Sequence, residues 1–206
     1  QKSQIDQQIT ATSNFFKSRM QDDSGQTYLI AIDPYFWMRH TQNILKNGHP
    51  GDEIRNGKPW DNHMFAPGGR EVPPDMFHAY FVAYIYKFLS FFNRDMSLAT
   101  VSFYIPLLIS ALSVIPAFFI TRKITGDFGG FITAVIVAMH PSFLVRTMGG
   151  ISDTDGYNIL FPLLIAWIFI QALEANRLRS NIILGFIGGI IVGLFSFTWG
   201  GWWYIF

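Results

Sequence analysis

Residues 102–121 read SFYIPLLISALSVIPAFFIT and contain no Asp, Glu, Lys or Arg. A transmembrane helix needs roughly 20 predominantly apolar residues, and prolines are tolerated within such helices. Three more charge-free stretches follow, and an aromatic-rich stretch with a single lysine either spans the membrane or lies at its interface. The sequence therefore predicts an all-α, polytopic transmembrane domain with helices at about 76–93, 102–121, 128–145, 157–173 and 181–206.

The charged residues are concentrated in the first half of the 206-residue chain. Residues 1–100 hold 10 of the 15 Lys and Arg residues and 10 of the 14 Asp and Glu residues. We therefore expect a polar external loop with a short helix at residues 1–75, followed by the membrane domain at 76–206. The absence of cysteine excludes a disulfide-rich secreted module. A net charge of +1 offers no basic surface of the kind that binds nucleic acid.

Basic residues between the apolar stretches indicate the orientation in the membrane. They occupy two short connections, at residues 122–123 and 177–179. Because Lys and Arg are enriched in cytoplasmic loops, these connections are predicted to face the cytoplasm. Residues 1–75 and the loop at 146–158 then lie outside. This arrangement predicts a multi-pass protein of the cell membrane with its polar site on the external face.

Asp33 stands at the start of a predicted helix in the external loop. An Asp followed by a Pro is typical of a helix N-terminus, with Asp at the cap and Pro at the first helical position. The helix is expected to end at the Gly- and Pro-containing stretch 47–51. Residues 50–75 then predict a long loop without secondary structure, which is typical of functional or disordered segments. Taken alone, Asp33 is interpreted most simply as the helix cap.

The stretch RTMGGISDTDGYN at 146–158 places Asp153 and Asp155 two residues apart between apolar segments. On an extended segment, side chains two residues apart share a face and can reach one cation. Carboxylates are ligands that hard divalent ions prefer, and such ions commonly bind substrate phosphates as well. The acidic pair therefore predicts a divalent-cation site. The alternative is a solvated turn in which Asp155 caps the next helix.

Arg146 precedes the acidic pair at the outer end of an apolar stretch. Two interpretations stay open for it. Its side chain either extends along the membrane surface to reach water, or it binds an anionic group, because a guanidinium matches phosphate oxygens. His63 and His78 lie in the outward region and could add a ligand, but their spacing assigns them no role.

Two stretches together resemble the oligosaccharyltransferase catalytic subunits. The run Asp33-Pro34-Tyr35-Phe36-Trp37-Met38-Arg39 is similar to that family's first external-loop motif, an Asp-Pro-aromatic-Phe-x-x-Arg run after the first transmembrane helix. Residues 146–155 resemble its second acidic motif through Arg146-Thr147, Gly150 and Asp153-Thr154-Asp155. Among the members of the family, the archaeal ones resemble this sequence most. A chain that starts at Gln1 and ends at Phe206 inside an apolar run is expected to be an N-terminal piece of such a protein.

The resemblance implies a membrane glycosyltransferase of the C type. Such enzymes transfer an oligosaccharide from a lipid-linked phosphate or pyrophosphate donor to the Asn amide of Asn-x-Ser/Thr in an acceptor polypeptide. By position, Asp33 is the implied catalytic residue, and Asp33, Asp153 and Asp155 are the implied ligands of Mn²⁺ or Mg²⁺. Arg146 is the implied substrate-binding residue. The expected partners are the lipid-linked donor, the acceptor and membrane lipid, without nucleic acid.

Parts of the family pattern have no counterpart in this chain. The later acidic loop is missing, and the aromatic run at 199–204 lacks the Asp of the family's Trp-Trp-Asp-Tyr-Gly motif, so we interpret it as an interfacial belt. The chain by itself is therefore expected to be inactive. Two other functions stay open, a different lipid-phosphosugar-dependent glycosyltransferase and a cation-binding transporter or scaffold fragment. A transporter would carry polar groups near the membrane midplane, whereas here they gather at one face.

Overall fold

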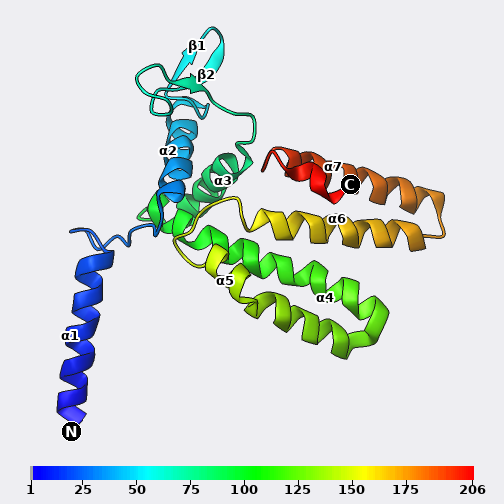
Figure 1. Cartoon of the computed structure of the whole chain (residues 1–206), viewed down its shortest axis with the longest axis horizontal. Coiled ribbons are helices and arrows are strands. Elements are labelled where there is room, and N and C mark those ends of the chain that lie inside the picture. The colour runs from blue at the N-terminus through cyan, green and yellow to red at the C-terminus, as the bar shows by residue number, and fades with distance from the viewer. Residues whose placement is uncertain (1) are drawn as a thin grey trace.

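The computed structural model describes residues 2–206, and most of this part of the chain is helical (Figure 1). This confirms the predicted all-α class. Helix α1 has no buried residue and projects away from the other elements. In chain order the elements are α1 Lys2–Met20, α2 Ile32–Asn47, β1 Glu53–Arg55, β2 Lys58–Asp61, β3 Arg70–Glu71, α3 Phe77–Phe92, α4 Leu98–Met139, α5 Pro141–Thr147, α6 Tyr157–Glu174, α7 Leu178–Ser196 and the 3-10 helix η1 Trp202–Ile205.

Within residues 2–206, three helices, α4, α6 and α7, are long and apolar enough to cross a membrane. Helix α4 is bent at Gly126, whose φ of 77° lies in the left-handed region that glycine adopts readily. Figure 1 shows the chain reversing direction near this bend. The second arm ends at Met139, because Pro141 disfavours a helical conformation at His140, whose ψ is 121°. The apolar stretch 128–145 is therefore divided between α4 and α5.

An apolar core holds the membrane helices together. Phe161 is central to it, with ring centroids 5.8 Å from Tyr157 and 5.5 Å from Phe195. The core places the start of α6 beside α3, and with it the acidic loop that precedes α6. The buried members of this core are Val82, Val101, Ile105, Ile109, Tyr157, Leu160, Phe161 and Phe195.

Residues 50–75 are not the unstructured loop that the sequence predicted. Strands β1, β2 and β3 form an antiparallel sheet in that order. Arg55 pairs with Lys58 across the two-residue turn Asn56-Gly57. Both turn residues have a positive φ, 51° and 77°, which is the hairpin geometry that Asn-Gly favours. The sheet lies near the C-terminal end of α2 (Figure 1).

Helix α2 begins one residue before Asp33, which corrects the predicted cap. Ala31 occupies the cap position without a side-chain cap hydrogen bond, and Asp33 lies in the first turn. Its negative charge still interacts favourably with the positive, N-terminal end of the helix dipole. The cap alternative for Asp155 is also wrong, because Gly156 occupies the cap position of α6. A second core packs α2 against α3 and consists of Ile44, Val72, Met76, Ala79 and Ala83.

Candidate active site

The two sequence motifs meet where the start of α2 faces the loop between α5 and α6. Trp37 lies one turn after Asp33, and its indole Nε1–H donates to Oδ1 of Asp153 at 2.9 Å. Because side chains at i and i+4 of a helix share a face, Asp33 lies on the side of α2 that carries Trp37. Asp33 is exposed and Asp153 is partly buried. The hydrogen bond thus joins the helix that carries Asp33 to the loop that carries Asp153 and Asp155.

Two glycines let the acidic loop pack closely against its neighbours. Gly150 has a φ of 90°. Its N–H donates to the carbonyl of Phe103 at 3.0 Å, and its own carbonyl accepts from the N–H of Ile30 at 3.1 Å. A Cβ at Gly149 would lie 2.5 Å from the Phe103 ring, and one at Gly150 would lie 2.9 Å from Cγ1 of Ile30. The loop is therefore held between α4 and the segment that leads into α2.

Arg146 reaches the second carboxylate of the acidic motif. Its Nη1 donates to Oδ2 of Asp155 at 3.0 Å, and the Arg146 side chain stays exposed. The other N–H groups of the guanidinium can donate to an anion. The pair lines a cavity of about 380 Å³ whose remaining lining residues are His140, Ser142, Phe143, Asn158 and Ile159.

The predicted metal ligands have carboxylate oxygens that are available to coordinate an ion. Oδ1 of Asp153 accepts from Trp37 and from Thr154, whereas its Oδ2 has no hydrogen-bond partner within residues 2–206. Asp155 pairs through Oδ2. Carboxylate oxygens suit Mg²⁺ and Mn²⁺, so these donors fit such an ion by their chemistry. Across the described residues, however, Asp33, Asp153 and Asp155 do not form a group whose ligand atoms all lie within 4.8 Å of one another.

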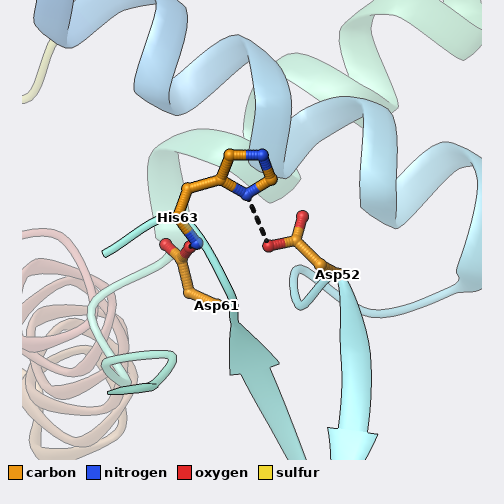
Figure 2. Close-up of side chains that lie close together, drawn as sticks. All are labelled: Asp52, Asp61 and His63. Atoms are coloured by element: carbon orange, nitrogen blue, oxygen red, sulfur yellow. Dashed lines mark hydrogen bonds and ion pairs between the residues drawn. The ribbon is translucent and has the colours of Figure 1, made fainter. Parts of the chain in front are cut away.

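A different set of side chains forms such a group. Asp52, Asp61 and His63 each offer one ligand atom within 4.8 Å of the others (Figure 2). Nδ1 of His63 lies 3.1 Å from Oδ2 of Asp52, which is the contact drawn as a dashed line in Figure 2. This acidic triad has donor types and spacing suited to a metal ion. Sequence reasoning missed it, although the Asn56-Gly57 turn signal would have placed Asp52 opposite Asp61 across the hairpin.

Arg39, the last residue of the first motif, already occupies both carboxylates of the triad. Its Nη1 lies 2.8 Å from each oxygen of Asp52, and its Nη2 lies 2.7 Å from Oδ2 of Asp61. A cation would have to displace this guanidinium to bind both groups. The triad and Arg39 therefore tie the sheet to α2, the helix that carries Asp33.

Hydrogen bonds keep these carboxylates ionised. Burial raises the pKa of Asp52, but donors from Asn43 and other neighbours, including Arg39, outweigh burial and hold that pKa below its ordinary value. The pKa of Asp61 is likewise lowered, since the hydrogen bond from Arg39 and two backbone amides overcome its burial. Burial lowers the pKa of His40, which lies against Asp61. The charges around Arg39 thus form a stable ion-paired anchor near neutral pH.

Comparison with known proteins connects the two motifs to a family. Residues 4–206 match the family model described as "Oligosaccharyl transferase STT3, N-terminal". The chain is 33% identical over 190 residues to a dolichyl-phosphooligosaccharide-protein glycotransferase of Methanococcus voltae, which covers 89% of this chain and 21% of that protein. It is 28% identical over 204 residues to the protein of the same name from Methanocaldococcus jannaschii, covering 92% of this chain and 22% of that protein.

The fold is similar to that of a solved enzyme. The oligosaccharyltransferase AglB from Archaeoglobus fulgidus, in complex with an inhibitory peptide and a dolichol-phosphate, matches with a TM-score of 0.69 at 22% identity, over 87% of this chain and 21% of that chain. Other structures of the A. fulgidus enzyme contain Zn and sulfate, or a tethered acceptor peptide with the NVT sequon. The chain thus spans about a fifth of the length of these relatives. Because the family model covers nearly all of its residues, the chain belongs to the oligosaccharyl transferase STT3 family, as part of its N-terminal region.

Proposed function

We propose that this chain is part of a membrane oligosaccharyltransferase for protein N-glycosylation. The enzyme transfers an oligosaccharide from a lipid-linked phosphate or pyrophosphate to the side-chain amide of Asn in Asn-x-Ser/Thr. The observation that carries the proposal is the Trp37–Asp153 hydrogen bond, which joins the two motifs beside the apolar helices. The names of the archaeal relatives, and the dolichol-phosphate and NVT-sequon complexes of the A. fulgidus enzyme, support these donor and acceptor classes.

Asp33 is proposed to orient the acceptor. An amide nitrogen is a poor nucleophile because its lone pair is conjugated with the carbonyl. A carboxylate that accepts hydrogen bonds from the amide N–H groups weakens this conjugation and aims the nitrogen at the anomeric carbon of the sugar. The new N–C bond forms as the C–O bond to the lipid phosphate breaks; the phosphate leaves with the bonding electrons, and the proton that the nitrogen gives up passes to a carboxylate of the site and then to water. Asp33 is exposed, so an acceptor can reach it from water.

Asp33, Asp153 and Asp155 are proposed to hold Mn²⁺ or Mg²⁺. The support is their donor chemistry, because Oδ2 of Asp153 and Oδ1 of Asp155 are left unpaired by their neighbours within residues 2–206. When bound, such an ion offsets the negative charge that develops on the departing phosphate. The carboxylates also place the acceptor amide next to the donor, which lowers the entropic cost of the reaction.

Arg146 is proposed to contact the donor phosphate. It lines the cavity beside Asp155 and uses one guanidinium nitrogen for that carboxylate, so its other N–H groups can donate to phosphate oxygens. We further propose that the site faces the outside of the cell membrane. The basic connections at residues 122–123 and 177–179 support this orientation.

The proposal is tested by transfer in vitro with the full-length protein. Purified enzyme is incubated with a membrane lipid extract and an Asn-x-Thr peptide, and the peptide mass is followed. We expect a glycosylated peptide in the presence of Mn²⁺ or Mg²⁺ and none when Gln replaces the acceptor Asn. Transfer of the same sugar to a different acceptor class, with the Asn-x-Thr peptide left unmodified, would refute the proposal.

A further inference from the structure

His78 is a buried titratable residue whose role the sequence left open. Its side chain is fully buried at the start of α3. Nδ1 lies 3.0 Å from the hydroxyl of Tyr157, and Nε2 lies 3.0 Å from Oγ of Ser152. A neutral imidazole has one donor and one acceptor, and a hydroxyl can serve as either. Both ring nitrogens are therefore satisfied in either tautomer.

The two partners of His78 flank the acidic motif. Ser152 directly precedes Asp153, and Tyr157 follows Asp155 by two residues. Both partners are buried, each with about 1% of its surface exposed. One imidazole on α3 therefore ties together the two ends of the segment that carries both carboxylates.

Trp37 completes the contact from the side of α2. Its ring lies edge-on to that of His78, with centroids 5.4 Å apart. Its indole N–H donates to Oδ1 of Asp153 at 2.9 Å, and the backbone N–H of Thr154 donates to the same oxygen at 2.6 Å. The threonine hydroxyl lies 3.4 Å from it. Donors thus surround Oδ1, which fixes the rotation of the carboxylate and leaves Oδ2 to bind a ligand.

We propose that Trp37 and His78 are positioning residues that hold the Asp153 carboxylate with Oδ2 presented to a divalent cation. This inference rests on the proposed function, in which Asp153 is a metal ligand. Groups that orient a metal ligand without touching the metal typically change affinity by about 10–100-fold when they are removed. A merely structural role for the two residues would change stability and leave the affinity for the ion intact.

The test measures Mn²⁺ binding to the full-length protein directly, by the electron paramagnetic resonance signal of free Mn²⁺. The Asp153→Asn variant identifies the binding that belongs to this site. We expect Trp37→Phe, which removes only the indole N–H and part of the ring, and His78→Gln each to raise the dissociation constant by about 10–100-fold. Because both residues act on one carboxylate, the double variant should bind Mn²⁺ only slightly more weakly than the single variant with the lower affinity.

A matched control separates positioning from folding. Trp60→Phe also removes an indole N–H, one that donates to the carbonyl of Gly68 in the sheet region and not to the acidic loop. This control is expected to shift the thermal midpoint without changing Mn²⁺ affinity. If either main variant fails to fold, Ser152→Ala replaces it in the test. This variant breaks the same connection without altering α2 or α3, and it is expected to weaken Mn²⁺ binding.

The outcomes distinguish the two proposals. Tight Mn²⁺ binding that Asp153→Asn leaves unchanged would overturn the metal assignment, and this inference with it. Binding that Asp153→Asn weakens, but Trp37→Phe, His78→Gln and Ser152→Ala leave intact, would overturn only the positioning role.

Discussion

Nη2 of Arg39 lies 2.7 Å from Oδ2 of Asp61, and only 1% of the Asp61 side chain is exposed. Arg39 belongs to the motif that carries Asp33, yet its guanidinium contacts residues at the β-sheet rather than the acidic loop. The same guanidinium also pairs with Asp52. The arginine of the motif thus fixes the helix on which Asp33 is presented.

Arg39→Ala is expected to destabilise the unit formed by α2 and the sheet. Removing one partner of a fully buried ion pair costs about 3–5 kcal/mol. Arg39 is 23% exposed and Asp52 17%, so we expect a smaller loss, caused mainly by the buried Asp61 carboxylate that is left without its partner. Arg39→Lys should recover only part of this loss, since an ammonium lacks the planar fork that meets both carboxylates. Limited proteolysis at residues 50–75 of the full-length protein measures the effect. Cleavage unchanged from wild type would contradict the anchoring role.

Acidification is expected to release the sheet before it affects the membrane helices. The pKa of His40 is lowered by burial, so protonation of the unfolded form favours unfolding as pH falls below about 6.5. The pKa values of Asp52 and Asp61 are lowered despite burial, so their contribution is present above about pH 4 and is lost as pH falls through their folded values. Hydrogen-exchange protection of the sheet at pH 7, 5 and 3 checks this order. Stronger protection at pH 3 than at pH 7 would be inconsistent with it.

Asp33→Asn and Asp153→Asn are each expected to reduce transfer by several orders of magnitude. Residues that act as a unit are strongly non-additive, so the double variant should be little worse than either single variant. Chelation of divalent ions should abolish wild-type transfer, and Mn²⁺ or Mg²⁺ should restore it. Asp6→Asn, which changes an exposed carboxylate on α1, is the matched control and should keep full activity. An active, Mn²⁺-dependent Asp33→Asn enzyme would remove Asp33 from the site.

Gly150→Ala is expected to disturb the acidic loop. Gly150 has a φ of 90°, and a left-handed conformation costs a non-glycine residue about 1–2 kcal/mol. The added Cβ would also lie 2.9 Å from Ile30 Cγ1. Transfer should fall together with the thermal midpoint. Gly189→Ala on α7 is the control, because its Cβ would meet no atom within 4 Å. Equal activity of the two variants would show that the acidic loop tolerates the added Cβ at residue 150.

The proposed orientation can be checked by labelling single cysteines. The 206 residues contain no cysteine, and both Glu53 and Arg179 are exposed. In right-side-out vesicles, an impermeant thiol reagent should label Glu53→Cys and not Arg179→Cys. A permeant reagent should label both and serves as the control for reactivity. The reverse pattern with the impermeant reagent would invert the membrane orientation.

Local patterns in the sequence predicted much of this molecule. Charge-free stretches identified α4, α6 and α7 as apolar helices, because a membrane span is a matter of length and composition. They did not give the ends of these helices, since α7 ends at Ser196 and not at residue 206. The Asp33 and Asp153 motifs identified the family, and the match of residues 4–206 to the family model confirms it. The hairpin was also predictable in principle, since Asn56-Gly57 is a strong turn signal, but the surrounding Gly and Pro residues favoured a loop.

Only the tertiary structure decided which distant side chains meet. Trp37 and Asp153 lie 116 residues apart, and they form a hydrogen bond because the packing of α2, α3 and α6 brings their elements together. His78 has no local signal for its role, since its partners come from the acidic loop and from α6. Arg39 found its partners in the hairpin rather than at the acidic motif. Periodicity, turn signals and composition act over a few residues, whereas these contacts depend on how helices pack across the whole chain.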